Sequence, residues 1–305
     1  GYPRRPRGRA LPVNRIVNAL TVDLEDYFHV SALAASIPRA DWDRCTSRVE
    51  RNTARLLELF ADHGVRATWF VLGWVAERYP QLVRAVAAAG HEVACHGYSH
   101  RLVYEQSPAE FRAETLRAKA LLEDQAGQAV VGYRAASYSV TAASLWALDI
   151  LAEAGFGYDS SIFPVRHDRY GIPGFERWPH VLRTPAGHPL VEFPLTTWRI
   201  AGVDVPIAGG GYFRLYPYAL TRAGLGAVNR RDGQAFVFYL HPWEIDPGQP
   251  RVRASRLSTF RHYNNLDRCE ARLERLLGDF AFDRVDRVLA GRGLSQAPAP
   301  EPVHA

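Results

Sequence analysis

The chain has 305 residues, 47% of them hydrophobic and 11% aromatic, and carries a formal net charge of +5. A chain of this length and hydrophobic content can bury a sizeable core, which excludes an intrinsically disordered protein. No apolar run approaches the roughly 20 residues of a membrane-spanning helix, so no transmembrane segment is expected. The arginines are scattered among acidic residues without a basic stripe, which argues against a nucleic-acid-binding protein.

The two ends of the chain differ in composition from its middle. Residues 1–15, which include "RRPRGR", are predicted to form a flexible basic arm, and residues 291–305 a disordered tail. The three cysteines are far apart and odd in number, which fits free thiols in a reducing compartment. We therefore expect a cytoplasmic or membrane-peripheral protein, and export stays open because a leader could precede Gly1. Nothing in the sequence indicates an oligomeric state.

Between residue 16 and about residue 290, short apolar runs alternate with longer amphipathic ones. Strands are predicted at 16–22, 66–72, 91–95, 130–135, 156–161, 191–196 and 235–240, and helices at 47–64, 80–90, 107–127, 144–155 and 218–231. Ser47 with Glu50, and Ser107 with Glu110, have the spacing of capping boxes at two helix starts. The segment 160–215 is looser and rich in Gly, Pro and aromatic residues, and we interpret it as elaborated loops.

Strands that alternate with helices pair in parallel through crossovers, as in a barrel or a doubly wound sheet. No glycine-rich phosphate loop follows any predicted strand, because "GGGYF" at 209–213 lacks the strand-then-helix context. Chemically capable residues instead collect at the ends of five predicted strands: Asp23, His96, Arg134, Asp159 and His241. In a parallel barrel all these strand ends meet at one face, so the pattern favours a barrel with its active site there.

The stretch "HEVACHGYSH" ends with two histidines four positions apart, His96 and His100. A surface pair or a core pair is the ordinary alternative to a metal site. One of the carboxylates that follow the first strand, Asp23, Glu25 or Asp26, would complete a set of two histidines and one carboxylate, with positions left for water and substrate. A second, unligated carboxylate beside that water could act as a general base.

Three further residues at strand ends fit amide hydrolysis. His241 could protonate the leaving nitrogen, because the unperturbed pKa of histidine lies near neutrality. Arg134 could pair with the base carboxylate and hold it ionised. Asp159 could orient a histidine or cap a turn. Taken singly, a structural histidine and a surface arginine are the competing interpretations.

In chain order, the motifs "TVDLED", "HGYSH", "YRAAS", "YDSSIFP" and "FYLHPW" resemble the five motifs of the NodB-type polysaccharide deacetylases, carbohydrate esterase family 4, over about residues 16–245. The C-terminal "FRHYNNLDRCEARLERLLGDFAFDRV" resembles the extension of a subgroup found near exosortase and exopolysaccharide gene clusters. The resemblance implies a distorted (β/α)7-type barrel that forms one catalytic domain over 16–290, with the extension from about 246. It also implies a divalent metal, with Zn²⁺ expected, and removal of N-acetyl groups from an amino-sugar polysaccharide or its precursor.

By the same resemblance, each motif residue receives a role. Asp23 matches the catalytic base and Arg134 the arginine that supports it. His96 and His100 match the metal ligands, and His241 matches the catalytic acid. The implied reaction has Asp23 take a proton from the attacking water and His241 protonate the departing amine.

The third metal ligand is where the chain departs from the family pattern of two adjacent aspartates, because Leu24 follows Asp23. On a strand-like path alternate side chains face the same way, which favours Glu25 beside Asp23. Asp26 remains an alternative ligand if the chain turns sharply there.

Substrate contacts are predicted from Tyr138, Trp243 and Asp159, and a backbone N–H near Tyr138 could stabilise the oxyanion. Ordinary barrel packing is the alternative for the aromatic residues. The unusual first motif also leaves open a cyclic amide or imide hydrolase on the same scaffold. A non-catalytic carbohydrate-binding protein is disfavoured, because the predicted base, acid and both histidines are all present.

Overall fold

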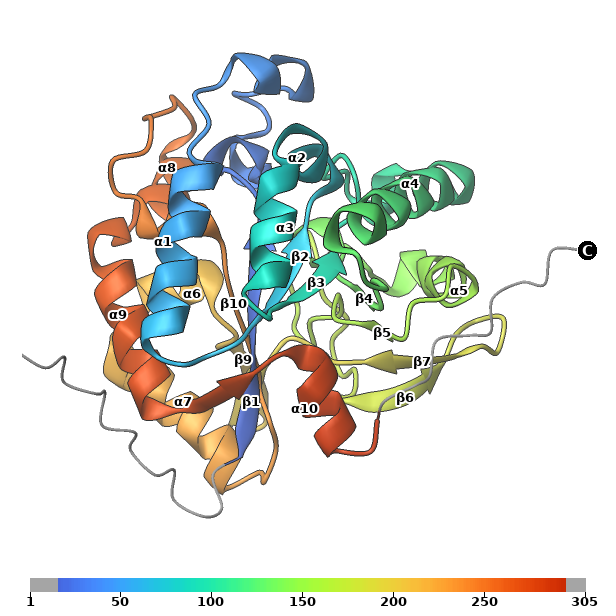
Figure 1. Cartoon of the computed structure of the whole chain (residues 1–305). Coiled ribbons are helices and arrows are strands. Elements are labelled where there is room, and N and C mark those ends of the chain that lie inside the picture. Colours follow the sequence, from blue (N-terminus) through green and yellow to red (C-terminus); the bar gives the residue numbers. More distant parts are fainter. Residues whose placement is uncertain (1–15, 295–305) are drawn as a thin grey trace, which may run out of the picture.

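The computed structural model describes residues 16–294, so the predicted basic arm at 1–15 and most of the predicted tail lie outside the described residues. Within them, seven parallel strands form the centre in the spatial order β10, β1, β2, β3, β4, β5, β7 (Figure 1). Their bounds are β1 (Val17–Leu24), β2 (Thr68–Val71), β3 (Glu92–Cys95), β4 (Gly132–Tyr133), β5 (Tyr158–Asp159), β7 (Pro189–Glu192) and β10 (Val237–Leu240). The predicted mixed α/β fold with a mainly parallel sheet is confirmed.

The gap between β7 and β10 is spanned by single contacts in place of a continuous ladder. Thr196 Oγ1 accepts a hydrogen bond from the Val237 N–H (2.9 Å). The Tyr239 N–H donates to Ala208 O (2.8 Å), next to an isolated parallel bridge between Gly209 and Tyr239. A Cβ at Gly209 would lie 2.0 Å from the Tyr239 carbonyl oxygen, so only glycine allows this approach. The barrel is therefore distorted at this seam.

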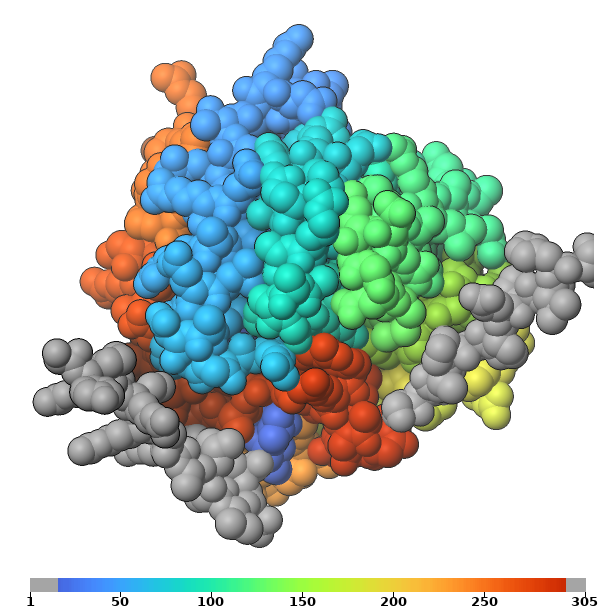
Figure 2. All heavy atoms as spheres, in the orientation of Figure 1, coloured from blue at the N-terminus to red at the C-terminus, as the bar shows by residue number. Residues whose placement is uncertain are grey.

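Helices cover the outside of the sheet, and α1, α3 and α4 pack side by side over the face seen in Figure 2. The predicted helices are observed as α1 (Val49–Asp62), α3 (Pro80–Ala88), α4 (Pro108–Ala126), α5 (Trp146–Glu153) and α7 (Tyr218–Arg230). A short helix that the sequence did not predict, α2 (Gly73–Arg78), follows β2 directly. No helix within 16–294 has the length and apolarity needed to cross a bilayer.

Alternation along the strands separates two apolar layers. In β1, Leu20, Val22 and Leu24 belong to the layer between sheet and helices, whereas Ala19 packs in the second cluster with Phe70. All five residues are fully buried. Because successive strand side chains point to opposite faces, the polar residues Thr21 and Asp23 share the side of Ala19.

One of the two predicted helix caps is confirmed and the other is wrong. At α4, the Ser107 side chain accepts from the Glu110 N–H while Glu110 accepts from the Ser107 N–H, a complete capping box. At α1, no box with Ser47 forms. The Asp26 carboxylate, which comes from the loop after β1, accepts the Arg48 N–H (2.6 Å) in its place. A carboxylate from a distant segment, Asp26, therefore caps α1 in place of the neighbouring Ser47.

The interpretation of 160–215 as loops is wrong in part. This segment contains β6 (His180–Arg183), the hairpin β8 (Thr197–Ile200) and β9 (Val203–Pro206), and α6 (Gly210–Leu215). β6 pairs antiparallel with β7, and β8 with β9. These strands have at most four residues and are partly exposed, so they lack the long apolar runs that made the barrel strands recognisable.

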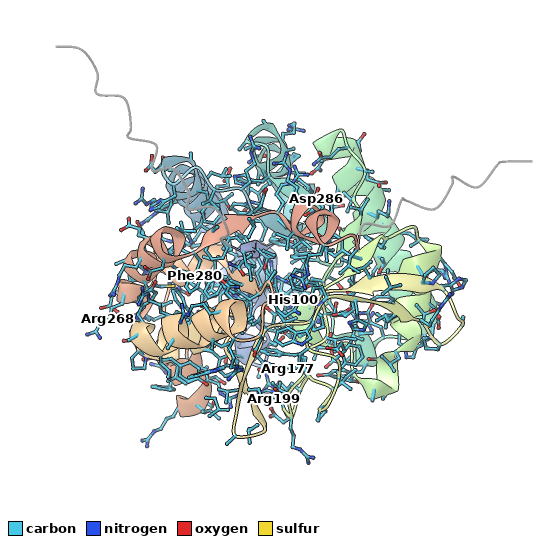
Figure 3. All side chains as sticks on the ribbon, turned by 90° about the horizontal axis from the view of Figure 1, so that it is seen from below. His100, Arg177, Arg199, Arg268, Phe280 and Asp286 are labelled. Atoms are coloured by element: carbon cyan, nitrogen blue, oxygen red, sulfur yellow. The ribbon has the colours of Figure 1, made fainter. Side chains whose placement is uncertain are left out.

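The C-terminal part wraps around the barrel as α8 (Arg256–Tyr263), α9 (Leu266–Asp279), β11 (Ala281–Asp283) and α10 (Val285–Gly291). β11 pairs in parallel with the first residues of β1. In the view from below, Asp286 marks α10, which lies inside the outer helices, and His100 lies near the centre of the view (Figure 3). Of the predicted tail, 291–294 complete α10 and its final turn. Short 3₁₀ helices occupy loops at Tyr27–His29, Ser31–Leu33, Arg39–Arg44, Val103–Glu105, Ala136–Tyr138, Ala142–Ser144 and Pro242–Ile245.

Candidate active site

The end of β1 directs two carboxylates to one side and a third elsewhere. Asp23 and Glu25 are separated by the outward-facing Leu24, and both line a pocket of about 390 Å³ at the C-terminal ends of the strands. Asp26 does not line this pocket. Its carboxylate accepts the backbone N–H groups of Tyr27, Arg48 and Val49 and thereby caps two helices.

Glu25, His96 and His100 form a buried group with the donor atoms of a metal site. One ligand atom from each lies within 4.8 Å of the other two. Glu25 Oε2 lies 2.9 Å from His100 Nε2. The Nδ1 of His96 lies 2.8 Å from the carbonyl oxygen of Arg134, which orients the ring and leaves Nε2 as the ligand atom. Two imidazoles and one carboxylate are a donor set typical of zinc and related divalent ions.

The protonation states of this group suit ligation. Burial would raise the pKa of Glu25, but the charge and hydrogen bond of His100 and the charges of His241 and His96 hold it well below its usual range. Burial lowers the pKa of His96 to about 4, so its imidazole is neutral at pH 7. Metal ligands must be ionised carboxylates or neutral imidazoles, and the surroundings of Glu25 and His96 favour those forms.

Asp23 is held by a fully buried arginine. Arg134 Nη1 donates to Asp23 Oδ1 (2.7 Å) and to Thr21 Oγ1 (2.7 Å). Its remaining donors reach the carbonyl and hydroxyl oxygens of Ser160, and its guanidinium lies 4.1 Å from the ring centre of Phe70. Every contact of Arg134 therefore fixes the position of the Asp23 carboxylate or of the guanidinium beside it.

Tyr138 contacts the other oxygen of the same carboxylate. Its hydroxyl donates to Asp23 Oδ2 (3.3 Å), and its side chain is buried. Ser137 and Tyr138 both have positive φ (50° and 55°), a strained backbone that turns the ring toward the pocket. The Tyr138 N–H donates to Ala135 O (3.0 Å), so this particular N–H is already used and is not a free oxyanion donor.

His241 follows β10 and faces both carboxylates. Its Nε2 lies 3.8 Å from Asp23 Oδ2 and 3.2 Å from Glu25 Oε1. Its Nδ1 lies 2.7 Å from Glu244 Oε1. Burial lowers the pKa of His241, but the hydrogen bond to Glu244 and the charges of Glu25, Glu244 and Asp23 raise it to about 9. The ring is thus protonated at neutral pH in these surroundings.

Glu244 and Arg214 are residues that the sequence reasoning missed. Glu244 Oε2 accepts from Arg214 Nε (2.6 Å), and both side chains are buried. Burial raises the pKa of Glu244, but Arg214 and His241 bring it to about 2. The spacing of Glu244, three residues after His241, was a visible signal in "HPWE". Arg214 offered no signal, because its partners lie 30 residues or more away in the chain.

Trp243 lies in the pocket wall between two histidines. Its ring stacks on His241 with centroids 5.3 Å apart and on His262 with centroids 4.3 Å apart. His262 Nε2 lies 2.7 Å from Gln249 Oε1. Arg214 Nη1 donates to the carbonyl oxygens of His262 and Asn264. The C-terminal segment therefore builds one wall of the pocket and supports the ring beside His241.

Asp159 does not line the pocket. Its side chain is fully buried, and its Oδ1 accepts from Ser161 Oγ (2.5 Å). Burial raises its pKa to about 6, against hydrogen bonds from Glu192 and Ser161. The predicted contact between Asp159 and a substrate does not fit this position behind the strand ends.

Two family models match this chain. Residues 41–158 match the family model described as polysaccharide deacetylase, and residues 160–290 match a domain of unknown function (DUF3473). The boundary between the two matches falls directly after β5, so both contribute strands to the same barrel. Asp23 and Glu25 precede the first match, and His241 lies within the second.

Two relatives and one solved structure illustrate the similarity. The chain is 30% identical over 124 residues to a peptidoglycan deacetylase from Helicobacter pylori, a match that covers 41% of each protein. It is 32% identical over 126 residues to a chitooligosaccharide deacetylase from Bradyrhizobium sp., covering 41% of this chain and 55% of that protein. The chain thus matches about half the length of these relatives. A Mycobacterium smegmatis structure assigned to the polysaccharide deacetylases shares the fold, with a TM-score of 0.61 at 21% identity over 96% of this chain and 98% of that chain.

Proposed function

We propose that this chain, which contains a polysaccharide deacetylase domain of the NodB type, is a metal-dependent hydrolase that removes N-acetyl groups from an amino-sugar polysaccharide or its precursor. The relatives named as deacetylases of peptidoglycan and of chitooligosaccharides support an amino-sugar substrate. The resemblance of the C-terminal extension to that of a subgroup found near exopolysaccharide gene clusters supports a place in the synthesis or modification of an exopolysaccharide. Three free cysteines support a reducing compartment.

Glu25, His96 and His100 would hold the metal, and Zn²⁺ fits them best. Their side chains are buried and their ligand atoms converge, whereas the Asp26 carboxylate is occupied by backbone N–H groups. This supports Glu25 as the third ligand. A divalent ion bound there would polarise the acetyl carbonyl and make a water molecule more acidic.

Asp23 would act as the general base. Arg134 holds one of its oxygens, Oδ1, whereas the other oxygen, Oδ2, lies 3.8 Å from His241 Nε2 and would take a proton from the attacking water. The guanidinium of Arg134, 2.7 Å from Oδ1, also fixes the orientation of the carboxylate. Tyr138 donates to Oδ2 and would orient the carboxylate toward the water.

His241 would act as the general acid. Glu244 accepts from Nδ1, which leaves the protonated Nε2 directed at the space above Asp23 and Glu25. A scissile amide in that space would receive the Nε2 proton on its nitrogen as the C–N bond breaks. Acetate and a free amine on the sugar are then released. In this scheme the proton removed by Asp23 and the proton given by His241 balance over one turnover.

The single observation that carries this proposal is that Asp23 and His241 face each other across the three converging ligands. The test is acetate release from an N-acetylglucosamine oligomer, with and without a chelator, paired with elemental analysis of the purified protein. We expect about one zinc ion per chain and acetate release that the chelator abolishes. Bound metal without acetate release would contradict the deacetylase and favour the cyclic amide hydrolase. Absence of metal after reconstitution would contradict both.

A further inference from the structure

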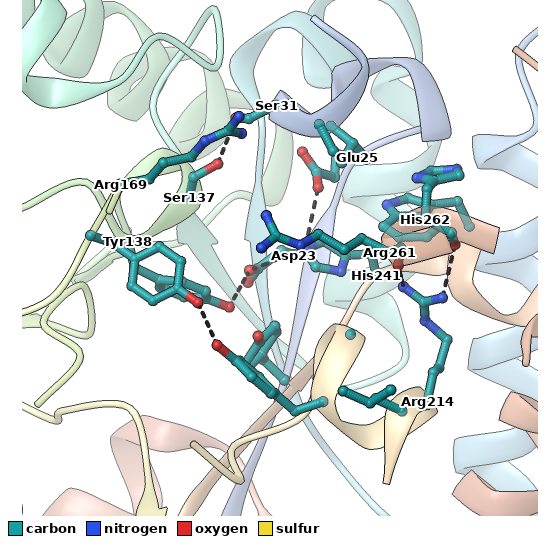
Figure 4. Close-up of a pocket in the computed structure, with 18 of the residues that line it drawn as sticks. Asp23, Glu25, Ser31, Ser137, Tyr138, Arg169, Arg214, His241, Arg261 and His262 are labelled. Atoms are coloured by element: carbon teal, nitrogen blue, oxygen red, sulfur yellow. Dashed lines mark hydrogen bonds and ion pairs between the residues drawn. The ribbon is translucent and has the colours of Figure 1, made fainter. Parts of the chain in front are cut away.

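The mouth of the pocket carries two arginines, Arg169 and Arg261, that form no ion pair within residues 16–294. Both are exposed, and both line the pocket. Arg169 lies in the loop after β5, and Arg261 lies on α8. In Figure 4, Arg169 enters beside Ser137, whereas Arg261 enters from the opposite side, beside His241. The two side chains therefore flank the opening above the proposed catalytic residues.

The charges of both guanidinium groups act on the same pocket residue, His167. Burial lowers the pKa of His167, the charge of Asp168 opposes this shift, and the charges of Arg261 and Arg169 lower the pKa further. His167 stacks on Tyr170 with ring centroids 3.8 Å apart, and both rings line the pocket. Because both arginine charges act on the His167 ring, the loop after β5 and α8 place positive charge at the same part of the pocket.

No described carboxylate at the pocket offsets these charges. Only Asp23 and Glu25 among the described lining residues are acidic, and both lie on the floor, where Arg134 and the histidines neutralise them. Beside Arg169, the exposed Asp168 carboxylate lies 2.9 Å from His167 Nδ1, and Asp168 is not among the residues that line the pocket. Around Arg261, the segment 247–266 contains three more arginines and no acidic residue. Within the described residues, the opening therefore carries two arginine charges that no lining carboxylate pairs with.

We propose that the glycan bound here carries an anionic group, a carboxylate or a phosphate, next to the acetylated sugar, and that Arg169 and Arg261 bind it. This inference rests on the proposed function, which it narrows from amino-sugar glycans in general to acidic ones. A guanidinium matches the geometry of a carboxylate or a phosphate with two parallel hydrogen bonds. A partly enclosed pocket strengthens such contacts relative to bulk water.

The test compares three oligosaccharides of equal length by calorimetry on the full metal-loaded chain. One is a neutral N-acetylglucosamine oligomer, one alternates N-acetylglucosamine with glucuronic acid, and one carries a phosphate. We expect at least one acidic oligosaccharide to bind about tenfold more tightly than the neutral one, and the two acidic arms identify the anion. Arg169→Gln and Arg261→Gln should each remove most of this preference. Arg84→Gln changes an exposed arginine of α3 that forms no ion pair in the described part of the chain, and should leave the preference intact.

Equal binding of neutral and acidic oligosaccharides by the unchanged chain would overturn the inference. Equal losses for neutral and acidic ligands in the two variants would do the same. Vesicles containing phosphatidylglycerol provide another arm, because Leu257 and Phe260 are exposed on the same helix as Arg261. If vesicle binding depends on Arg169 and Arg261 and the three oligosaccharides bind equally, the two arginines bind a membrane surface and not an acidic glycan. Acetate release is recorded in parallel: its absence from every sugar contradicts the proposed function, whereas the binding preference still decides this inference.

Discussion

Two groups of buried carboxylates in this molecule have pKa values that are shifted in opposite directions. At the C-terminal ends of the strands, the surrounding histidines and Arg214 overcome burial, so the pKa of Glu25 lies below its usual range and that of Glu244 is about 2. Elsewhere in the barrel, burial and the charge of Asp286 raise the pKa of Glu92 to about 8. Burial and the charge of Asp159 raise that of Glu192 well above its usual range.

The difference lies in the partners and not in the depth of burial, since all four carboxylates are buried. Glu92 is surrounded by the hydroxyl groups of Thr68 and Tyr158 and by a backbone N–H. Hydroxyl groups solvate a carboxylate less well than water does, so the neutral form is preferred. A buried base or metal ligand must stay ionised, and it can do so only where cations have been built in beside it.

Removing the negative charge of Asp23 should have the largest effect. Asp23→Asn keeps the shape of the side chain but cannot accept a proton from water, so we expect the rate of acetate release to fall by about 10²–10⁴-fold. Elemental analysis should show unchanged metal content, because Asp23 is not in the ligand group. A rate near that of the unchanged chain would remove Asp23 as the base.

Removing the positive charge of Arg134 should lower the free energy of unfolding. Arg134→Leu leaves Asp23 buried without its partner, and we expect the free energy of unfolding in urea to fall by about 3–5 kcal/mol. The double variant Arg134→Leu/Asp23→Asn should regain part of this loss, because no buried charge is left unpaired. If the double variant is no more stable than Arg134→Leu, the loss comes from packing over Phe70.

Local periodicity explains which parts of the site were predictable. Alternation along β1 predicts that Asp23 and Glu25 share a face, and the rule for parallel strand ends predicts that His96, Arg134 and His241 meet. The structure brings all five together around one pocket or directly beneath it. These features depend on near neighbours in the chain or on the fold class as a whole.

What could not be predicted depends on contacts between distant segments. Arg214 reaches Glu244 only because the backbone carbonyls of 261–264 fix its guanidinium. β5 has only two residues, so no alternation reveals where Asp159 points. Its carboxyl group faces Glu192 of β7, a strand that is separated from β5 by the irregular segment.

The raised pKa of the buried Glu92 carboxyl can be tested through the dependence of stability on pH. Its folded-state pKa of about 8 exceeds the ordinary value of 4.5, so the folded state binds more protons than the unfolded state between these values. Stability from this group is therefore complete below about pH 4.5 and is lost as pH rises toward 8. Glu92→Gln imitates the protonated form and should gain stability over the unchanged chain by up to about 1.4 kcal/mol per pH unit within that window.

The measurement is urea unfolding of both proteins at several pH values between 5 and 9, with the difference plotted against pH. Titrating groups remote from Glu92, such as the histidines of the pocket, cancel in that difference because both proteins contain them. A difference that stays constant with pH would show that Glu92 titrates normally in the folded state. The contrast with Glu25 and Glu244 would then lose its strongest member.

Asp26 is the intermediate case and should show the smallest effect. Burial raises its pKa, whereas hydrogen bonds from backbone N–H groups and Ser47 lower it, and no cationic side chain in the described residues pairs with it. Asp26→Ala removes the cap of α1 and should cost about 1–2 kcal/mol in urea unfolding while metal content stays the same. Glu25→Ala is the matched control, since it should lose the metal. Loss of metal from Asp26→Ala with retention in Glu25→Ala would transfer the third ligand to Asp26, and backbone N–H groups alone would then suffice to keep a buried ligand ionised.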